Sequence, residues 1–479
     1  MNNILFIMMD QWRYDAMGCM GKFPIKTPNI DRLVAGGTTF NNAYCTDPVC
    51  VPARASVMTG VYAYDHGVYY NDQNWPDSLP TWADKLAQNC YYTTLVGKTH
   101  FCPPRKAAGF QKILVEEDYK ENLQRLGLAK PRTPGKPSEG AYLNKVYPLE
   151  PTHIPLNEYE PVFFTNRALH ELDLIGRRRE CRPGGNEPFA MKLSFLLPHS
   201  PCVPPEPYFS MYQPEDLPPP VGVEQDRAGY SRQLQSWHEI WSQLDWKRAL
   251  KHRAQYFGCV TLLDEQIGRV LRKLEELQLI DNTLIILTAD HGDYLCDHRF
   301  QQKGFFHDCS ARVPFIFNGP GVPVGRQVRE NVSHIDLFPT LLDYCGLAMP
   351  RLRDPAGRLI YADQCESEAM SLLPYFAGTE EPVAPERVII AEQAMHGQRF
   401  MLKQGAAKFN YYLNPDGNNE HDYFDLASDP DELNNRGRSF ALDDLSPAMR
   451  QAFDRVLEKS ARHAAHYYYY QNKIRPVFT

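Results

Sequence analysis

Three mainly apolar runs constrain the fold of this chain more than any other feature of its sequence. They cover residues 4–9, 189–197 and 283–288. Runs of this length and composition are typical of strands buried on both faces, as in parallel sheets covered by helices. An apolar stripe at helical spacing between Val260 and Leu274 predicts one of those helices. We therefore expect an α/β protein with a large, mixed, mostly parallel sheet flanked by helices.

The C-terminal part of the chain has a different pattern. Short apolar and aromatic segments alternate there with turn residues, which predicts a small antiparallel sheet. A helix is expected from about residue 447 to residue 466, and a linker-like change of composition spans residues 366–382. We therefore expect an α/β domain over residues 1–375 and an α+β subdomain over residues 376–479. The predicted C-terminal strands are residues 387–390, 399–402, 408–412 and 423–426.

The segment Cys50-Val51-Pro52-Ala53-Arg54 carries the strongest chemical signal. Pro52 suits the first turn of a helix, because its missing N–H is not needed there. Cys50 should then lie at or just before a helix N-terminus, where free N–H groups and the helix dipole favour an anion. Arg54, one turn later, would face the same side. Two interpretations remain open: a nucleophile held at an anion-binding site, or a buried cysteine followed by a surface arginine.

Polar residues follow the predicted buried strands. Asp10 comes directly after the first run, and Asp290 and His291 follow the third. In open α/β sheets, ligands bind at the carboxyl ends of the strands, so these three side chains are candidates for a divalent metal site. For Asp10 the alternative is an ordinary turn or capping aspartate.

Two further strand ends carry basic residues. Lys98 and His100 follow a predicted strand over residues 93–97, and His199 follows the second apolar run. Lys98 and His100 are two positions apart, so both side chains can point to one face. A solvated lysine and a structural histidine are the alternative interpretation of this pair.

In this order, these segments resemble the sulfatase family, whose hallmark is Cys-x-Pro-x-Arg. The resemblance covers nearly the whole chain and implies an alkaline-phosphatase-like fold that hydrolyses a sulfate monoester. The other matching segments are Gly97-Lys98-Thr99-His100, Pro198-His199-Ser200-Pro201, Asp290-His291-Gly292 followed by His298, and Gln302-Lys303-Gly304.

The resemblance implies a role for each residue. A maturation enzyme would oxidise Cys50 to formylglycine (3-oxoalanine), whose hydrate is the nucleophile. The implied metal ligands are Asp10, residue 50, Asp290 and His291, around one divalent cation. The implied catalytic residues would stabilise charge on the sulfate, protonate the leaving group and assist the elimination step. They are Cys50, Arg54, Lys98, His100, His199 and Lys303.

One departure from the family affects both metal and substrate. The first strand of sulfatases commonly ends in two aspartates, whereas Gln11 takes the second place here. Calcium is the first expectation for the metal, and manganese the second, because His291 supplies nitrogen in place of an oxygen ligand. Gln11, Asn71 and His298 are candidates for substrate contacts.

Two other functions remain open at this point. The Asp10-Gln11 pair is also found in phosphonate monoester hydrolases, so a phosphonate monoester or phosphodiester hydrolase on the same scaffold is the nearest alternative. A non-catalytic glycan- or metal-binding protein that keeps Cys50 as a thiol is the second, and it predicts no turnover.

Composition excludes several classes of partner. A net charge of -7 argues against a general nucleic-acid binder. The apolar run at residues 4–9 is too short to span a membrane and lacks the basic start of a signal peptide. The twelve cysteines have no metal-ligand or redox-motif spacing, so we expect reduced thiols in a cytoplasmic protein.

A basic run is the remaining feature. Arg177, Arg178, Arg179 and Arg182 lie close together in an acidic chain. Most such runs are solvated faces. The alternative is a subsite for an anionic substrate, and with the aromatic middle of the chain it favours a sulfated sugar as the substrate.

Overall fold

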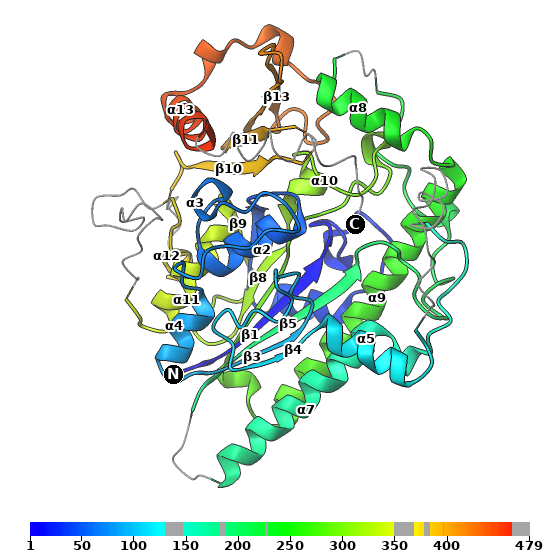
Figure 1. Ribbon diagram of the computed structural model, residues 1–479, viewed down its shortest axis with the longest axis vertical. Coiled ribbons are helices and arrows are strands. Elements are labelled where there is room, and N and C mark those ends of the chain that lie inside the picture. Colours follow the sequence, from blue (N-terminus) through cyan, green and yellow to red (C-terminus); the bar gives the residue numbers. More distant parts are fainter. Residues whose placement is uncertain are drawn as a thin grey trace.

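The computed structural model describes residues 1–129, 147–181, 187–225, 229–348, 368–377, 384–395 and 397–461. In these parts of the chain, nine strands form a large sheet and four form a smaller one. Figure 1 shows the smaller sheet above the larger one, on the side towards which β1 runs.

The larger sheet is mixed and mostly parallel. Its strands are β1 (Asn3–Asp10), β2 (Thr38–Tyr44), β3 (Tyr92–Gly97), β4 (Lys112–Leu114), β5 (Phe189–Pro198), β6 (Thr283–Ala289), β7 (Arg312–Val313), β8 (Phe315–Asn318) and β9 (Arg326–Ser333). Their order is β4-β3-β5-β1-β6-β8-β2-β7, with β9 paired to β2. The five strands from β4 to β6 run parallel, β8 is antiparallel to both neighbours, and β9 is parallel to β2. The predicted fold class is confirmed.

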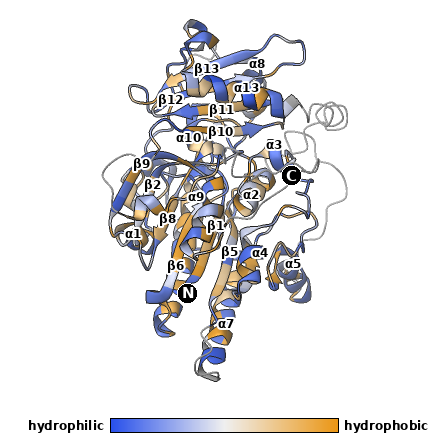
Figure 2. Cartoon of the chain, turned by 90° about the vertical axis from the view of Figure 1, so that its left-hand side faces the viewer, coloured by the Kyte–Doolittle hydropathy of each residue, from blue (hydrophilic) through white to orange (hydrophobic). Residues whose placement is uncertain are grey.

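Strand β1 lies at the centre of the parallel part. Every one of its residues is buried, and Figure 2 shows β1, β5 and β6 as a largely hydrophobic layer. The register pairs Asp10 with Pro198 of β5 and Met9 with Ala289 of β6. The carboxyl ends of the three predicted strands therefore meet at one edge of the sheet.

Helices cover both faces of this sheet. One group packs around α7 and α9, with α1 beside α9, and a second group consists of α2, α4 and α11 (Figure 1). The helices are α1 (Pro28–Ala35), α2 (Cys50–Thr59), α3 (Ala63–His66), α4 (Trp82–Gln88), α5 (Glu116–Arg125), α7 (Glu160–Cys181), α8 (Arg232–Trp241), α9 (Trp246–Glu276), α10 (Asp308–Ala311), α11 (Leu337–Tyr344), α12 (Leu373–Phe376) and α13 (Pro447–Ala461).

The smaller sheet is antiparallel, in the order β10-β11-β12-β13. Its strands are β10 (Val388–Gln393), β11 (Arg399–Gln404), β12 (Ala407–Tyr412) and β13 (Glu420–Asp425). Helix α13 covers it, and Phe453 packs on Phe400 and Tyr411 with ring centroids 5.5 and 4.9 Å apart. The Glu392 N–H of β10 donates to the Thr46 carbonyl at 2.8 Å, which joins this sheet to the segment before α2.

Several predicted elements differ in detail. Residues 313–317 form two strands, because Pro314 interrupts the ladder between β7 and β8. Strands β2 and β9 were not predicted from the sequence, and the end of the predicted helix at residues 462–466 lies outside the described residues. The domain boundary at residue 375 stays a prediction.

No described helix combines the length and apolar character needed to cross a bilayer. The ten cysteines whose side chains are described are all free thiols.

Candidate active site

Cys50 is the first residue of α2 and is buried at the carboxyl edge of the larger sheet. Val49 precedes it in an extended conformation and caps α2 with no side-chain hydrogen bond. Asn71 takes over that function, since its Oδ1 accepts from the Val51 N–H at 3.1 Å. Asn71 therefore fixes the first turn of the helix that carries Cys50, and its contact with substrate stays a prediction.

Four buried side chains converge at this edge. Asp10, Cys50, Asp290 and His291 each offer one ligand atom, and these atoms all lie within 4.8 Å of one another. Cys50 Sγ is 3.2 Å from His291 Nε2 and 3.8 Å from Asp10 Oδ1. His291 Nδ1 lies 3.0 Å from the Gly292 carbonyl. Because a carbonyl only accepts, Nδ1 carries a proton, and Nε2 is the ring nitrogen directed at the cluster.

Arg54 holds the two carboxylates together. Its Nε donates to Asp290 Oδ2 at 2.9 Å, and its Nη2 donates to Asp10 Oδ2 at 3.1 Å. Its Nη1 donates to the Lys98 carbonyl and to Ser194 Oγ, at 3.2 and 3.0 Å. Arg54 is completely buried, so these four acceptors fix the guanidinium in one orientation. The alternative interpretation, in which Arg54 lies on the surface, is wrong.

Lys98 and His100 reach the same cluster from the end of β3. Lys98 forms an ion pair with Asp10, and both are buried. Gly97, before it, has a φ of 107°, and a Cβ there would lie 1.7 Å from a carbonyl of β5. His100 has a φ of 53° and acts, with other groups, to lower the pKa of Cys50. Glycine at 97 and the turn at 100 therefore direct both basic side chains towards Cys50.

The charged groups around the cluster lower the pKa values of Asp10 and Cys50. Burial acts to raise the pKa of Asp10, but the surrounding positive charges, with Lys98 foremost, hold that pKa well below its ordinary value. Burial also acts to raise the pKa of Cys50, yet Lys303, Lys98 and other groups hold that pKa well below its ordinary range. An anion at residue 50 is thus strongly stabilised, as a site for an oxyanion requires.

Lys303 and His199 lie together at the partly open side of the cluster. Lys303 Nζ donates to His199 Nε2 at 2.8 Å and to Gln11 Oε1 at 2.6 Å. His199 Nδ1 lies 2.7 Å from the Ser200 carbonyl, so its proton is on Nδ1 and Nε2 accepts from Lys303. Gln11 Nε2 donates to Asp293, which turns Oε1 of the same amide towards Lys303. Gln11 therefore positions this lysine.

The smaller sheet holds the loop that carries Lys303. Arg399 of β11 donates to the Gly304 carbonyl through Nε at 3.0 Å and through Nη2 at 2.6 Å. Gly304 has a φ of 112°, a conformation that only glycine adopts readily. The position of the Lys303 ammonium thus depends on both sheets.

His298 is not brought to this cluster. Its Nδ1 hydrogen-bonds Gln225 Oε1 at 3.0 Å, and its ring lies 4.3 Å from the ring of His307. Cys296, His298 and Arg299 all have positive φ values, of 77°, 54° and 64°, and they turn the loop away from Cys50. Spacing along the chain alone does not foresee such a turn.

The basic run also lies elsewhere. The Arg179 Nη2 donates to Asn3 Oδ1 at 2.7 Å, and Arg178 lies over the Tyr92 ring at 4.6 Å. Asn3 and Tyr92 begin β1 and β3, so these two arginines lie at the opposite end of the sheet from Cys50. Arg182 lies outside the described residues. These contacts remove the argument for an anionic subsite at this run.

Two residues of the site escaped the sequence analysis. Asp293 directly follows the Asp290-His291-Gly292 motif, so its position was a usable signal. Ser194 lies in the middle of the apolar strand β5 and gives no such signal. Its contact with Arg54 arises only from the pairing of β5 with β1.

The donor set fits a divalent cation. It combines two carboxylates, one imidazole nitrogen and residue 50, all buried. Arg54 takes only Oδ2 of each carboxylate, which leaves Oδ1 of Asp10 facing Cys50. The Gly292 carbonyl fixes the His291 tautomer in the way typical of metal-ligating histidines.

Known proteins of one family resemble this chain. The sulfatase family model matches residues 2–347. An arylsulfatase of Clostridium perfringens (strain 13 / Type A) is 31% identical, over 90% of this chain and 89% of its own. A choline-sulfatase of Rhizobium meliloti (strain 1021) is 30% identical, over 90% and 82%. The crystal structure of a phosphonate monoester hydrolase of Agrobacterium radiobacter superposes with a TM-score of 0.74 at 25% identity, over 97% of this chain and 96% of that one. The chain therefore belongs to the sulfatase family of sulfuric ester hydrolases.

Proposed function

We propose that this sulfatase cleaves a sulfate monoester with a nucleophile derived from Cys50 and one divalent metal. The observation that supports the proposal is the convergence of Asp10, Cys50, Asp290 and His291 within 4.8 Å at the carboxyl edge of the sheet. Three cationic side chains, Arg54, Lys98 and Lys303, surround this point and match the charge that a sulfate brings.

Two groups beyond the encoded side chains belong to this proposal. The metal, held by Asp10, residue 50, Asp290 and His291, would supply Lewis-acid stabilisation of charge on the sulfate oxygens. Formylglycine made from Cys50 by a maturation enzyme would supply, as its hydrate, the hydroxyl that attacks sulfur. Arg54 fixes two of the ligand carboxylates, which keeps them oriented whatever substrate enters.

The residues around Cys50 divide the remaining work. Lys98 and Lys303 offset charge on the sulfate oxygens, and such preorganised donors are commonly worth about 2.7–4 kcal/mol of barrier each. Lys303 and His199 serve the leaving oxygen, with Lys303 carrying the transferable proton because Nε2 of His199 is an acceptor. His100, which acts to lower the pKa of Cys50, serves the elimination that restores the nucleophile.

Calcium is the first choice of metal and manganese the second. The two carboxylates suit calcium, whereas the nitrogen of His291 suits manganese better. Gln11 occupies the place of a further carboxylate but is bound to Lys303 and Asp293. To distinguish the two, the metal is removed with EDTA, and the activity restored by calcium is compared with that restored by manganese.

A phosphonate monoester or phosphodiester hydrolase is the second candidate. It is favoured by Gln11 and His291 and by the structural likeness to the Agrobacterium enzyme. Lys98 and His100, both placed against the cluster, favour the sulfate ester. The alcohol of the substrate is proposed as a small molecule or a sugar, and the arginine run of α7 no longer supports the sugar.

The first test combines mass spectrometry and kinetics. We expect a peptide spanning Cys50 from active protein to show the mass of the aldehyde instead of the thiol. We also expect kcat/KM to be higher for 4-nitrophenyl sulfate than for 4-nitrophenyl phenylphosphonate, and Cys50→Ala to abolish both activities. An unmodified Cys50 in active protein would remove this nucleophile. Faster phosphonate turnover would replace the proposed substrate class with the second candidate.

A further inference from the structure

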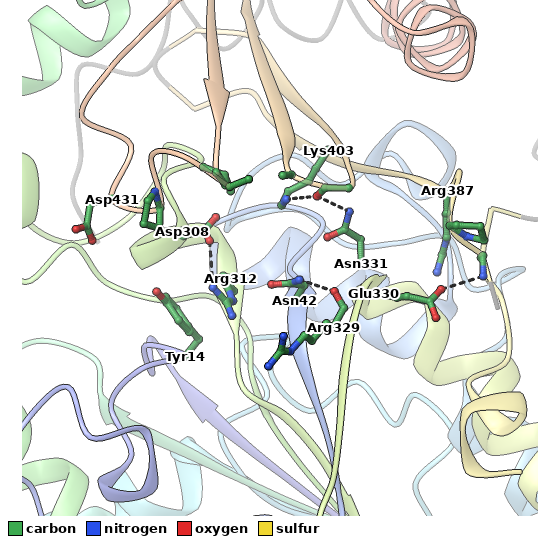
Figure 3. Close-up of a pocket in the computed structure, with 17 residues that line it drawn as sticks. Tyr14, Asn42, Asp308, Arg312, Arg329, Glu330, Asn331, Arg387, Lys403 and Asp431 are labelled. Atoms are coloured by element: carbon green, nitrogen blue, oxygen red, sulfur yellow. Dashed lines mark hydrogen bonds and ion pairs between the residues drawn. The ribbon is translucent and has the colours of Figure 1, made fainter. Parts of the chain in front are cut away.

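A second polar cavity lies away from the Cys50 cluster, between the larger and the smaller sheet. Its volume is about 480 Å³, within the range of about 300–1,000 Å³ typical of small-molecule sites. Figure 3 shows its walls, to which Asn42 of β2, Asn331 of β9, Arg312 of β7, Lys403 of β11 and Tyr14 contribute. The residues that line it include none of the proposed metal ligands or catalytic side chains.

Three cationic groups face this cavity with spare hydrogen-bonding capacity. Lys403 is 2% exposed, and its Nζ donates to the Gly405 carbonyl at 2.7 Å, with no carboxylate in ion-pair contact among the described residues. Burial lowers the pKa of Lys403 to about 8. Arg329 is exposed, and its side chain makes no polar contact within the described part of the chain. Arg312 lies 4.1 Å above the ring of Tyr14; its Nε donates to the Asn41 carbonyl and its Nη1 to Asp308, so its spare donor is Nη2, which makes no hydrogen bond among the described residues.

The acids of the cavity are mostly engaged elsewhere. Asp308 forms ion pairs with Lys408 at 2.5 Å and with Arg312 at 3.4 Å. Glu330 Oε2 accepts from the Tyr375 hydroxyl and from a backbone N–H, each at 2.9 Å. Asp431 lies exposed at the rim. Lys403 and Arg329 are therefore the cationic groups of the wall that have no ion pair among the described residues, in a chain whose net charge is -7.

The carboxamide of Asn331 requires a hydrogen-bond donor from a ligand. This residue is 9% exposed, and its Nδ2 donates to the Gly405 carbonyl at 3.1 Å. Its Oδ1 is buried and has no hydrogen-bond partner among the described residues, and Figure 3 shows Asn331 among the side chains around the cavity. A buried acceptor of this kind needs a donor, which a ligand hydroxyl supplies.

We propose that this cavity is a second, non-catalytic binding site for a small hydroxylated organic acid, such as a sugar acid. Lys403, Arg312 and Arg329 bind its oxyanion, and Asn331 accepts a hydrogen bond from an adjacent hydroxyl. A carboxylated and a sulfated sugar share this chemistry. The site is distinct from the proposed sulfate-ester site, because it uses other residues on the far side of β2.

Isothermal titration calorimetry on the full-length enzyme tests this proposal with glucuronate, which carries no sulfate ester. We expect one saturable site with a Kd of about 1 mM or lower. Arg329→Ala and Lys403→Met should each weaken binding about tenfold or more. Lys26→Ala removes an exposed cation outside the cavity and should leave the Kd unchanged. Thermal unfolding of each variant establishes that it is folded, and Arg329, being exposed, gives the safer variant.

The ligand series separates the two sources of the oxyanion. If Arg329→Ala weakens the binding of glucose 6-sulfate as much as that of glucuronate, both acids bind at the same site. Glucose should not bind there, and sodium sulfate should bind more weakly than either sugar acid. The proposal would be overturned by the absence of saturable binding, by equal affinity of sodium sulfate and glucuronate, or by binding that folded Arg329→Ala and Lys403→Met leave intact.

Discussion

Replacing Lys192 by methionine should stabilise the protein. Lys192 lies in the middle of β5, between Phe6 of β1 and Leu95 of β3, and it is completely buried. Its Nζ has no hydrogen-bond partner among the described residues and lies 5.2 Å from the ring of Phe101. Methionine has a similar unbranched shape and no polar group, so it fills the same space without the unpaired amine.

The magnitude follows from the proton on this amine. Burial lowers the pKa of Lys192 well below its ordinary value, and the charge of Arg54 lowers it further. In the unfolded chain the amine has its ordinary pKa of about 10.4, and removing its proton at pH 8 costs about 3 kcal/mol. Since the unfolded state binds more protons, this part of the stability rises with pH and is lost as the pH falls. Lys192→Met should therefore be more stable by about 2–4 kcal/mol at pH 8.

Urea unfolding followed by circular dichroism at pH 8 and pH 9 measures this effect. The advantage of Lys192→Met should shrink by about 1.4 kcal/mol between the two values, because the wild type gains stability with pH and the variant does not. Lys26→Met, at an exposed position, should change neither value. A variant no more stable than the wild type, or a difference independent of pH, would refute the assignment of a neutral, unpaired amine.

Three further predictions concern the site and its surroundings. Asn71→Ala should lower the unfolding free energy by about 0.5–2 kcal/mol, measured in urea, because the Val51 N–H loses its acceptor. Lys303→Met should lower kcat/KM about 10²–10³-fold for an alkyl sulfate but less for 4-nitrophenyl sulfate, whose leaving group needs no proton. Burial, offset in part by Asp297, lowers the pKa of His298 to about 4. Because the unfolded chain then binds a proton below about pH 6.5 that the folded protein does not, the unfolding free energy should fall by roughly 3 kcal/mol between pH 6.5 and pH 4.

Each of these has its own control. Asn71→Asp keeps an oxygen acceptor and should retain most of the stability, and a loss equal to that of the alanine variant would contradict the capping role. Equal losses of Lys303→Met on both sulfates would argue against proton donation to the leaving oxygen. His298→Gln should flatten the acid branch of the stability curve, and an unchanged branch would assign it to other groups.

The parts of the fold that were predictable are those in which one signal dominates. Strands β1, β5 and β6 are mainly apolar runs, and their parallel pairing brings Asp10 and Asp290 to one edge without further information. Strand β2 was missed because its sequence, Thr-Thr-Phe-Asn-Asn-Ala-Tyr, is half polar. It is stabilised by pairing with β7, β8 and β9, which lie far along the chain.

The site was predictable where residues follow a strand or begin a helix. Cys50, Arg54 and Lys98 are in this class, since a short segment fixes their direction. His298 was misplaced because successive positive φ values reverse the loop, a property that its residue types do not encode. The contact between Lys303 and Gln11 depends on Asp293, so it requires three segments to be placed at once.

The two hydrogen bonds from Arg399 to the Gly304 carbonyl make the smaller sheet part of the support for Lys303. Because Gly304 directly follows Lys303, any shift of β11 moves the ammonium group relative to His199. Exchange of C-terminal segments between relatives would then alter the reacting geometry as well as the surface. A substitution at the junction between the two sheets would therefore reach the site without changing a residue that lines it.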